Sequence, residues 1–547
     1  MKLFNWFQKR TPPGGDRRDP TLRRRSYDGA KTGRLTSDWF ATTTSSDAEL
    51  NSDLPTLRNR SRSLCRDNVY ARRARTIFQS NVVGTGIRMQ SIRLDAMGNR
   101  REEENRSIEL AWWHWSMSNG CHTGGMLSLT EILRLAVGEV FEAGEVLLRF
   151  VDRPFGNSKI PLAIEVIEAE RLVSSAKVQI LPNGNQVRMG VEVDEWGRPQ
   201  AYWVYRGHPG DSVFRGYNSQ EHVRIPAEEC VHLYVCNRWP QTRGEPWMAT
   251  VIRRLRDIDM YSKAELIAAR AAANIMGFVK KPEDAAPGAD DDDDDDDDEA
   301  RSLPMSPGEV WWLNAGESYE GFNPSRPNTG LDPFLRFMVR EVATGIGVSY
   351  EVLSRDYSNS NYSSSRLSIL DDRQAFKVLQ NWLIAKFLYP CFRRWFRAAS
   401  LAGAFSVKAA ASEEEEWLES VRFQAPGWSW IDPTKEIAAY VAAVQAGFTT
   451  VSDVIAQTGG DAEDTFKARR TELDYMAELG LEFSTSSGKA APPPPPDPPP
   501  KDDLEEDDQG QGAEEDADAG SEEDSEGDSE QDSDGDSEEE PEEDRKP

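Results

Sequence analysis

Apolar residues recur at helical spacing from residue 365 to about residue 400, in the longest periodic segment of the sequence. The residues that share this face are Leu367, Leu370, Phe376, Leu379, Leu383, Phe387 and Leu388. At the rise of an α-helix such a segment spans on the order of 50 Å. Pro390 lies inside the segment and removes a backbone donor, so we expect one very long helix that is kinked or interrupted there.

The part of the chain before this segment changes from helical to strand-like patterning. Residues 61–150 look mainly helical. Apolar residues recur at helical spacing from Leu129 to Val140, and Ser128 or Thr130 is the expected N-cap of that helix. From about residue 144 to residue 236, short β-rich runs alternate with turn sequences such as residues 194–199. Together these patterns predict an α+β fold with an antiparallel or mixed sheet.

The order of elements continues with helices that flank an irregular segment. Pro246 is expected to open a helix that reaches about residue 275, because proline suits the first helical turn. Residues 277–330 are irregular and contain nine consecutive aspartates at 290–298. A shorter helix is expected over residues 331–347 and a polar loop over residues 348–364, before the long helix. Short helices are expected over residues 431–482, where Gly447 and Gly459 end two of them and Asp461 caps the last.

The formal net charge of −30 comes from two acidic appendages. Residues 501–547 carry 25 acidic and 3 basic residues, and residues 283–299 carry 12 acidic residues and no basic ones. Without these net charges of −22 and −12, the remainder of the chain has a net charge of +4. The folded body is therefore nearly neutral, and residues 483–547 are predicted to be a disordered, Pro-rich and acidic tail.

The N-terminal part of the chain is basic. Residues 1–34 hold ten Lys or Arg residues against three Asp, and residues 1–60 are predicted to form a flexible arm. A second basic group comprises Arg58, Arg60, Arg62, Arg66, Arg72, Arg73 and Arg75. Such groups suit contact with phosphate, and a solvated helix face or a disordered arm is an equal alternative.

The cysteine count and the hydropathy bound the compartment. Five cysteines without a secretory signal indicate free thiols, and no apolar run approaches the roughly 20 residues of a membrane span. We therefore expect a protein that is made in a cytoplasm and has no membrane partner.

Motifs for catalysis or for binding a cofactor are not apparent. The sequence has no G-x-x-x-x-G-K-[ST] phosphate-binding loop, so any movement of DNA must be powered by another subunit. The spacing of Cys230, His232 and Cys236 does not fit a zinc finger. Trp112, Trp113 and Trp115 suit core packing or a subunit interface better than stacking on bases. We expect no catalytic residue, no cofactor and no metal site.

Four segments are similar to the lambda-type branch of the portal proteins of tailed bacteriophages. They are NVYARRARTIFQSNVVGTG (residues 68–86), EVDEWGRPQAYWVYRGHPGD (192–211), IPAEECVHLYVCNRWPQTRGEP (225–246) and GIGVSYEVLSRDYSNSNYSSSRLS (345–368). The order of elements also resembles the plan of that family, and the resemblance covers about residues 60–480.

The resemblance implies a portal fold assembled as a ring of about twelve copies. By position, residues 61–245 correspond to a β-rich wing, 246–276 and 331–347 to two stem helices, and 277–330 to the clip with its acidic insert. Residues 348–364 correspond to a tunnel loop, 365–430 to the long wing helix and its connection, and 431–482 to a helical crown. The implied protein is not an enzyme.

The resemblance also implies where the protein acts and with what. It places the ring at one capsid vertex of the virion, after assembly in the bacterial cytoplasm, where DNA is packaged and ejected. The implied partners are double-stranded DNA, the terminase large subunit, capsid and scaffolding proteins, and a head–tail adaptor.

The loop of residues 348–364 is the predicted DNA-contacting element. Its serine, asparagine and tyrosine side chains can bond phosphate oxygens without reading sequence, and arginines add positive charge at its two ends. The candidate contact residues are Arg355, Ser358, Asn359, Asn361, Tyr362 and Arg366. Few apolar residues anchor its middle, so the loop is expected to move easily.

Two other classes of protein remain open from the residues. One is a capsid or scaffolding protein without enzymatic activity, and the other is a DNA-processing enzyme with a basic arm. Rings with an axial hole in electron micrographs would distinguish a portal from both.

Overall fold

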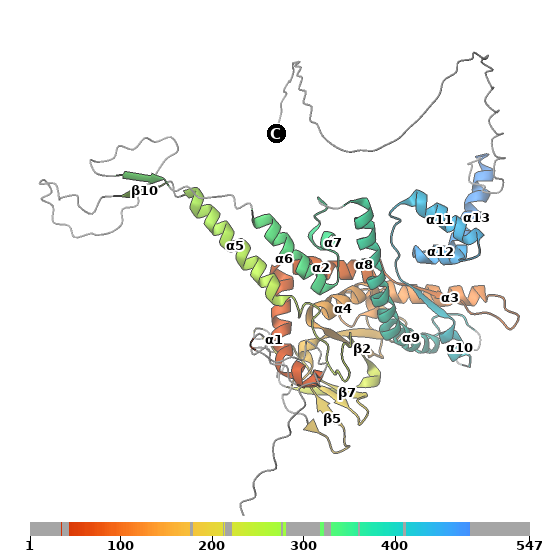
Figure 1. Cartoon of the computed structure of the whole chain (residues 1–547). Coiled ribbons are helices and arrows are strands. Elements are labelled where there is room, and N and C mark those ends of the chain that lie inside the picture. The colour runs from red at the N-terminus through yellow and green to blue at the C-terminus, as the bar shows by residue number, and fades with distance from the viewer. Residues whose placement is uncertain are drawn as a thin grey trace, which may run out of the picture. The chain divides into compact units, whose positions relative to one another are not determined.

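The computed structural model describes residue 34 and residues 43–481, with gaps at 175–178, 212, 214–220, 275–276, 281–317, 322–329, 359–360 and 408–411 (Figure 1). The chain divides into a unit of residues 1–473 and a unit of residues 474–547, and each is considered by itself. The aspartate run, most of the expected clip, the outer part of the expected arm and the expected tail lie outside the described residues.

Part of the expected flexible arm is a packed helix. Helix α1 (Ser46–Asp67) is capped by Ser45, whose hydroxyl accepts the backbone N–H of Ala48 at 3.2 Å. Leu50 and Leu54 lie one turn apart and are buried in one cluster with Met189. The arm prediction for residues 1–60 is therefore wrong from residue 46 onward, because one face of this polar segment is covered by the sheet region.

Three further helices follow α1 and contribute buried residues to the core. They are α2 (Val69–Phe78), which continues into the π-helix η3 (Gln79–Val83), α3 (Glu102–Met117), followed by the short turn η4 (Asn119–Cys121), and α4 (Leu129–Ala143). Ser128 and Glu131 form a capping box at the start of α4, so Ser128 is the cap of the two residues that the sequence proposed.

A three-stranded antiparallel sheet lies between α4 and the other sheet. Its order is β3 (Ala163–Glu168), β2 (Glu145–Val151), β9 (Cys230–Tyr234). Val146 and Leu148 of β2 point into the main core, whereas Leu147 between them packs with residues of the second sheet. This alternation is the side-chain period of a strand buried on both faces.

The second sheet has five short antiparallel strands, drawn in yellow in Figure 1. In order they are β4 (Gln179–Ile180), β5 (Gln186–Arg188), β6 (Val191–Val193), β7 (Pro199–Tyr205) and β8 (His222–Pro226). The turns η5 (Ala169–Arg171) and η6 (Ala227–Glu229) connect the strands of the two sheets. All pairings between the named strands of the described residues are antiparallel, as the α+β prediction allows.

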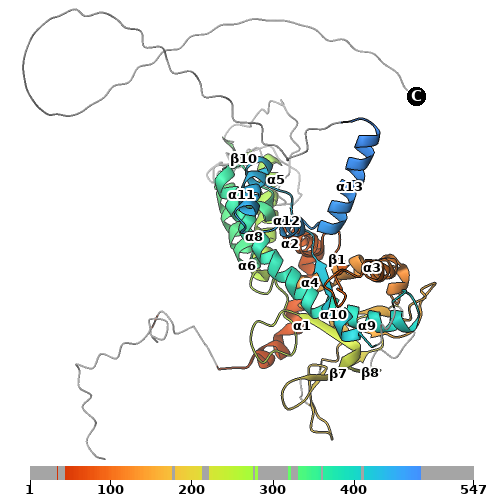
Figure 2. The same ribbon diagram turned by 90° about the vertical axis from the view of Figure 1, so that its right-hand side faces the viewer.

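Two long helices run side by side beyond the sheets (Figures 1 and 2). Helix α5 (Ile252–Asn274) begins later than predicted, because Pro246 lies in a turn in which its carbonyl accepts the N–H of Ala249 at 2.9 Å. Helix α6 (Leu331–Ile346) matches its prediction and ends at Gly347, which has a φ of 82°. The rings of Tyr261 and Phe334 meet edge to face across the pair at 5.1 Å.

The long periodic segment is interrupted as its proline predicts. Helix α8 (Tyr362–Leu383) passes into the π-helix η7 (Ile384–Leu388) and then into α9 (Tyr389–Leu401). The N–H of Tyr389 bonds to the carbonyl of Ile384, five residues earlier, and Pro390 occupies the first turn of α9. The wide turn accommodates a proline that cannot donate to the ordinary helical ladder.

The remaining elements are short. Strand β1 (Arg88–Ser91) pairs with β12 (Val421–Gln424), and β10 (Gly277–Lys280) pairs with β11 (Ser318–Gly321). The other helices are α7 (Tyr350–Ser354), α10 (Glu414–Glu419), α11 (Pro433–Gln445), α12 (Val451–Gln457) and α13 (Ala462–Glu478). Gly447 and Gly459 adopt positive φ at the ends of α11 and α12, and Asp461 caps α13, all as predicted. Among the described residues, no helix has the length and apolar character needed to cross a membrane.

Candidate functional site

The predicted loop of residues 348–364 contains a short helix that the sequence did not indicate. Ser349 donates both its N–H and its hydroxyl to the carboxylate of Asp372 in α8, at 3.0 and 2.7 Å. Val348, just before α7 (Tyr350–Ser354), and Leu353, within it, are buried in the core. The expectation of a loop is therefore wrong for residues 350–354, which form α7. Beyond them, the exposed residues that the structure describes are Arg355, Tyr357, Ser358 and Asn361.

Arg355 marks the point where α7 ends. Its N–H donates to the carbonyl of Glu351 at 2.8 Å, and its φ of 58° places it in the left-handed region. Arginine rarely adopts this conformation, which costs on the order of 1 kcal/mol or more. The conformation ends the helix and leaves the Arg355 side chain exposed.

Asp356 organises the next turn of the loop. Its carboxylate accepts the Ser358 hydroxyl at 2.6 Å, the Ser358 N–H at 3.1 Å and the Tyr350 hydroxyl at 2.9 Å. Arg336 of α6 lies 3.6 Å from the same carboxylate. The Ser358 hydrogen bonds first, then the Tyr350 hydroxyl, lower the pKa of Asp356 to about 2.

The predicted contact residues divide into three groups. Arg355 and Ser358 are exposed on the loop, and Asn361 is an exposed N-cap whose side chain accepts the Ser364 N–H at 2.8 Å. Arg366 lies inside α8 and is 3.9 Å from Glu436 of α11, so it does not mark the end of the loop. Tyr362 is the first residue of α8, and Asn359 lies outside the described residues.

Other arginines beside the loop come from parts of the chain that the sequence did not connect with it. Arg73 of α2 donates through Nε and Nη2 to the carbonyl of Val352, both at 3.4 Å. Arg340 of α6 lies over the Tyr350 ring, with 5.2 Å between its guanidinium carbon and the ring centroid. Only the packing of α2 and α6 against α7 brings them to the loop, so no local sequence pattern could have found them.

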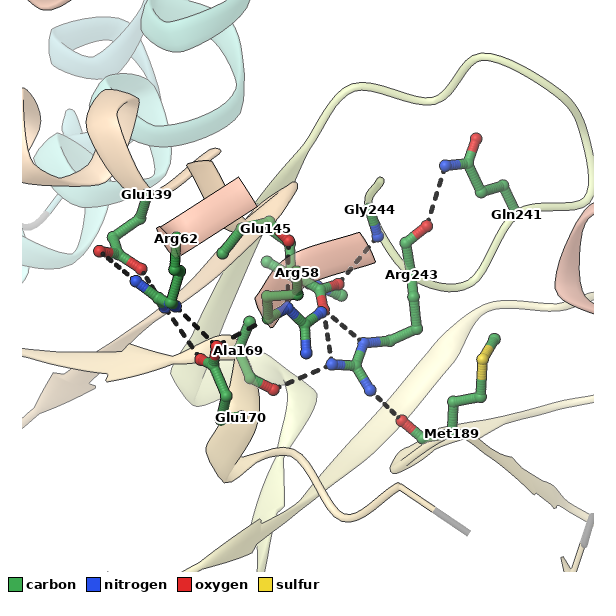
Figure 3. A network of polar contacts seen from close by, with 12 residues as sticks. Arg58, Arg62, Glu139, Glu145, Ala169, Glu170, Met189, Gln241, Arg243 and Gly244 are labelled. Carbon is green, nitrogen blue, oxygen red and sulfur yellow. Dashed lines mark hydrogen bonds and ion pairs between the residues drawn. The ribbon is translucent and has the colours of Figure 1, made fainter. Parts of the chain in front are cut away.

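The basic group of α1 and α2 has a second use inside the protein. In Figure 3 the carboxylate of Glu145 lies among donors from α1 and from the turn of residues 243–244. Its Oε1 accepts Arg58 Nη2 and Arg243 Nε, each at 2.7 Å, and its Oε2 accepts the Gly244 N–H at 2.9 Å and faces His232 Nε2 at 2.9 Å. Burial raises the pKa of Glu145, but Arg243, His232 and Arg58 outweigh it and hold that pKa well below its usual range.

A neighbouring cluster joins α1 and α2 to α4 and η5. Arg62 pairs with Glu170 at 2.7 Å and with Glu139 at 2.8 Å, and Arg75 pairs with Glu142 at 3.0 Å (Figure 3 shows Arg62 with its first two partners). Arg58, Arg62 and Arg75 therefore hold the fold together. Neither a solvated helix face nor phosphate contact describes these three residues, and both predictions for them are wrong.

Two glutamates and a histidine lie close together, and such residues can bind a metal ion. Glu168, Glu170 and His208 bring ligand atoms within 4.8 Å of one another among the described residues. Both oxygens of Glu170 already accept Arg62, and His208 Nδ1 accepts the Gly210 N–H at 3.0 Å. His208 Nε2 faces Glu168 at 3.6 Å. Contacts within the protein therefore account for this geometry without a metal.

The tryptophans of α3 serve the core. Trp112 and Trp115 are buried, and the Trp112 ring meets Trp395 of α9 edge to face at 5.1 Å. Trp115 donates its indole N–H to the carbonyl of Leu162 at 3.0 Å. Trp113 is 55% exposed. Core packing is confirmed for two of the three.

Comparison with known proteins connects this fold to one family. A family model described as phage portal protein, lambda family, matches residues 32–380. The probable portal protein of Halomonas phage phiHAP-1 is 31% identical over 479 residues, which cover 87% of this chain and 91% of that protein. Portal protein B of Escherichia phage lambda is 23% identical over 492 residues, which cover 82% of this chain and 89% of that protein.

The similarity to solved structures is weaker. A chain from the neck of an empty gene transfer agent particle, computed with C6 symmetry, has a TM-score of 0.40 and 14% identity, over 73% of this chain and 93% of that chain. The identity and coverage of the phage relatives, together with the match over residues 32–380, show that the chain belongs to the lambda family of phage portal proteins.

Proposed function

We propose that this portal protein assembles into a closed ring of about twelve copies at one vertex of the capsid, as identical subunits commonly close by cyclic symmetry. Double-stranded DNA passes through the channel of the ring when it is packaged and when it is ejected. Family membership is the observation that carries this proposal. The proposal assigns no catalytic role to the chain.

We assign the parts of the ring from the resemblance of the element order to the plan of the portal family. Helices α5 and α6 serve as the stem, and residues 277–330 between them as the clip. The two sheets with α1 to α4 serve as the wing, together with the long helix of α8, η7 and α9. Helices α11 to α13 serve as the crown.

The proposed partners meet different parts of the ring. The terminase large subunit and later the head–tail adaptor dock on the clip, where the run of nine aspartates offers an anionic surface for a basic patch. Capsid and scaffolding proteins contact the outer surface during assembly in the bacterial cytoplasm. In the virion the ring remains at the vertex.

The segment of residues 355–361 is the proposed contact with DNA. Arg355, Ser358 and Asn361 are exposed there, and Asp372 and the buried Leu353 hold the base of the segment in place. Exposed hydroxyl, amide and guanidinium groups bond phosphates weakly and without regard to sequence. A channel needs such contacts, because they retain DNA and still let it slide.

Replacing residues 355–360 with a Gly/Ser linker tests this assignment. The change keeps Asn361 as the cap of α8 and leaves α7 intact, so the rings should assemble and enter capsids normally. The capsids should either fail to fill with DNA or lose the DNA that they have packaged. The matched control replaces the exposed turn of residues 96–97 with Gly/Ser. Capsids of the loop variant that fill and hold a full genome at the normal rate would show that the loop does not contact DNA.

A further inference from the structure

We infer that Arg73 of α2 and Arg355 of the loop together form a binding site for one phosphate group of the DNA backbone. The inference rests on the proposed passage of DNA beside residues 355–361, and it adds a helix residue to a contact that was otherwise confined to the loop.

The position of Arg73 is fixed by the chain before any ligand arrives. Its Nε and Nη2 both donate to the Val352 carbonyl near the end of α7. A guanidinium has five N–H groups, so this double contact leaves both N–H groups of Nη1 and one of Nη2 for another acceptor. A guanidinium that is already held loses less side-chain entropy when it binds an anion.

Arg73 is held at the Val352 carbonyl, and Arg355 follows three residues later at the C-cap of α7, so the two arginines meet at the same end of this helix. Partial burial, followed by the positive charge of Arg355, lowers the pKa of Arg73. Two positive charges close together repel each other, and an anion between them offsets that repulsion. A phosphate group supplies that charge and several acceptor oxygens, and it matches the planar donor geometry of arginine.

Nearby carboxylates are engaged elsewhere. No ion pair joins Arg73 or Arg355 to a carboxylate of the described residues, although other arginines of α1 and α2 are paired. Asp356 accepts Ser358 and Tyr350 and lies near Arg336. Glu351 gives only its backbone carbonyl to Arg355. The positive charge of the pair is thus not neutralised by these neighbours.

The chain offers a matched control for Arg73. Arg72 is the adjacent residue of α2, and its side chain is exposed rather than held against Val352. Arg73→Gln and Arg72→Gln therefore remove the same charge from the same helix. At the loop, Arg355→Asn removes the charge and keeps a residue that tolerates positive φ.

The experiment measures the affinity of purified rings for a short DNA duplex as a function of salt. Each phosphate contact contributes roughly 0.9 to the slope of log K against log salt. We expect Arg73→Gln and Arg355→Asn to weaken binding several-fold and to lower the slope by about that amount, whereas Arg72→Gln has a smaller effect on both. The double variant should lose less than the product of the two single effects, because both arginines bind one phosphate.

Two results would overturn the inference. In the first, Arg73→Gln binds DNA with the affinity and slope of Arg72→Gln. In the second, Arg73→Gln loses binding of inorganic phosphate but keeps full affinity for DNA, which would make the site a receptor for free phosphate. Either result leaves the proposed function standing if the Gly/Ser variant of residues 355–360 still fails to retain DNA.

Discussion

Glu145 shows how a single residue decides the arrangement of distant segments. Its side chain is fully buried and meets donors from α1, β9 and the turn of residues 243–244. Arg58 precedes it by 87 residues and Arg243 follows it by 98. A buried charge persists only where opposite charges and hydrogen bonds replace its water, and here both are present.

Removing the charge of Glu145 should therefore destabilise the fold strongly. Glu145→Gln removes the counter-charge of Arg243 and leaves Arg58 with only its 4.0 Å contact to Glu170. We expect the free energy of unfolding to fall by about 3 kcal/mol or more in urea denaturation. Glu229→Gln is the control, because Glu229 is paired with Arg149 at a partly exposed position, where the expected loss is about 0–1 kcal/mol. Equal losses in the two variants would mean that the buried network does not stabilise the fold.

Glu192 gives the fold a dependence on pH. The hydrogen bonds from Arg224 lower the pKa of Glu192 to about 2, against burial, with help from Asn185. A carboxyl whose pKa is depressed in the folded state stabilises the protein above its unfolded pKa of about 4.3 and loses this contribution as the pH falls toward the folded value. Between these pH values the contribution declines progressively.

A comparison of the wild type with Glu192→Gln measures this dependence. The difference between their urea midpoints should be largest at pH 6 and should shrink as the pH is lowered from about 4 toward 2. A difference that stays constant over this range would show that the charge of Glu192 is not the source of its contribution.

Among the elements, helix α1 is one whose stability depends on contacts with distant residues, which its own sequence does not reveal. Its composition is polar and basic, and only three leucines interrupt the part before Arg58. The helix is stable because Leu50 and Leu54 are covered and because its arginines meet glutamates that lie far along the chain. Neither partner is visible from within the segment, which explains the wrong prediction of an arm.

A substitution in α1 tests whether this segment is part of the fold. Leu54 is 3% exposed, so Leu54→Ala should lower the free energy of unfolding by about 2–5 kcal/mol. Asn59→Ala changes an exposed residue of the same helix and should stay within about 0.5 kcal/mol of the wild type. An arm without a packed face would tolerate both changes equally.

The structure agrees with the sequence prediction where an element begins or ends at residues that are close together in the sequence. The capping box at Ser128, the glycines that end α11 and α12, and the interruption before Pro390 all depend on residues within a few positions of one another. The helix α7 was missed because its anchors, Asp372 and the surfaces of α2 and α6, lie in other elements. The same reason hid Arg73 and Arg340 from the candidate site, whereas Arg355 and Ser358 remain predicted contacts that await a test.

At the scale of the whole molecule, the chain presents surfaces that one copy leaves uncovered. Met260 and Ile267 of α5 and Phe337 of α6 are each more than half exposed. Leu367 and Val378 of α8 are 72% and 68% exposed. Apolar side chains on neighbouring long helices suit contact with a second copy of the chain, as the proposed ring requires.

Imaging of the purified protein by electron microscopy, together with native mass spectrometry, tests the proposed ring. We expect closed rings of about twelve copies with an axial channel. Particles that remain monomers and dimers across protein concentrations and salt conditions, with no ring in any image, would contradict it.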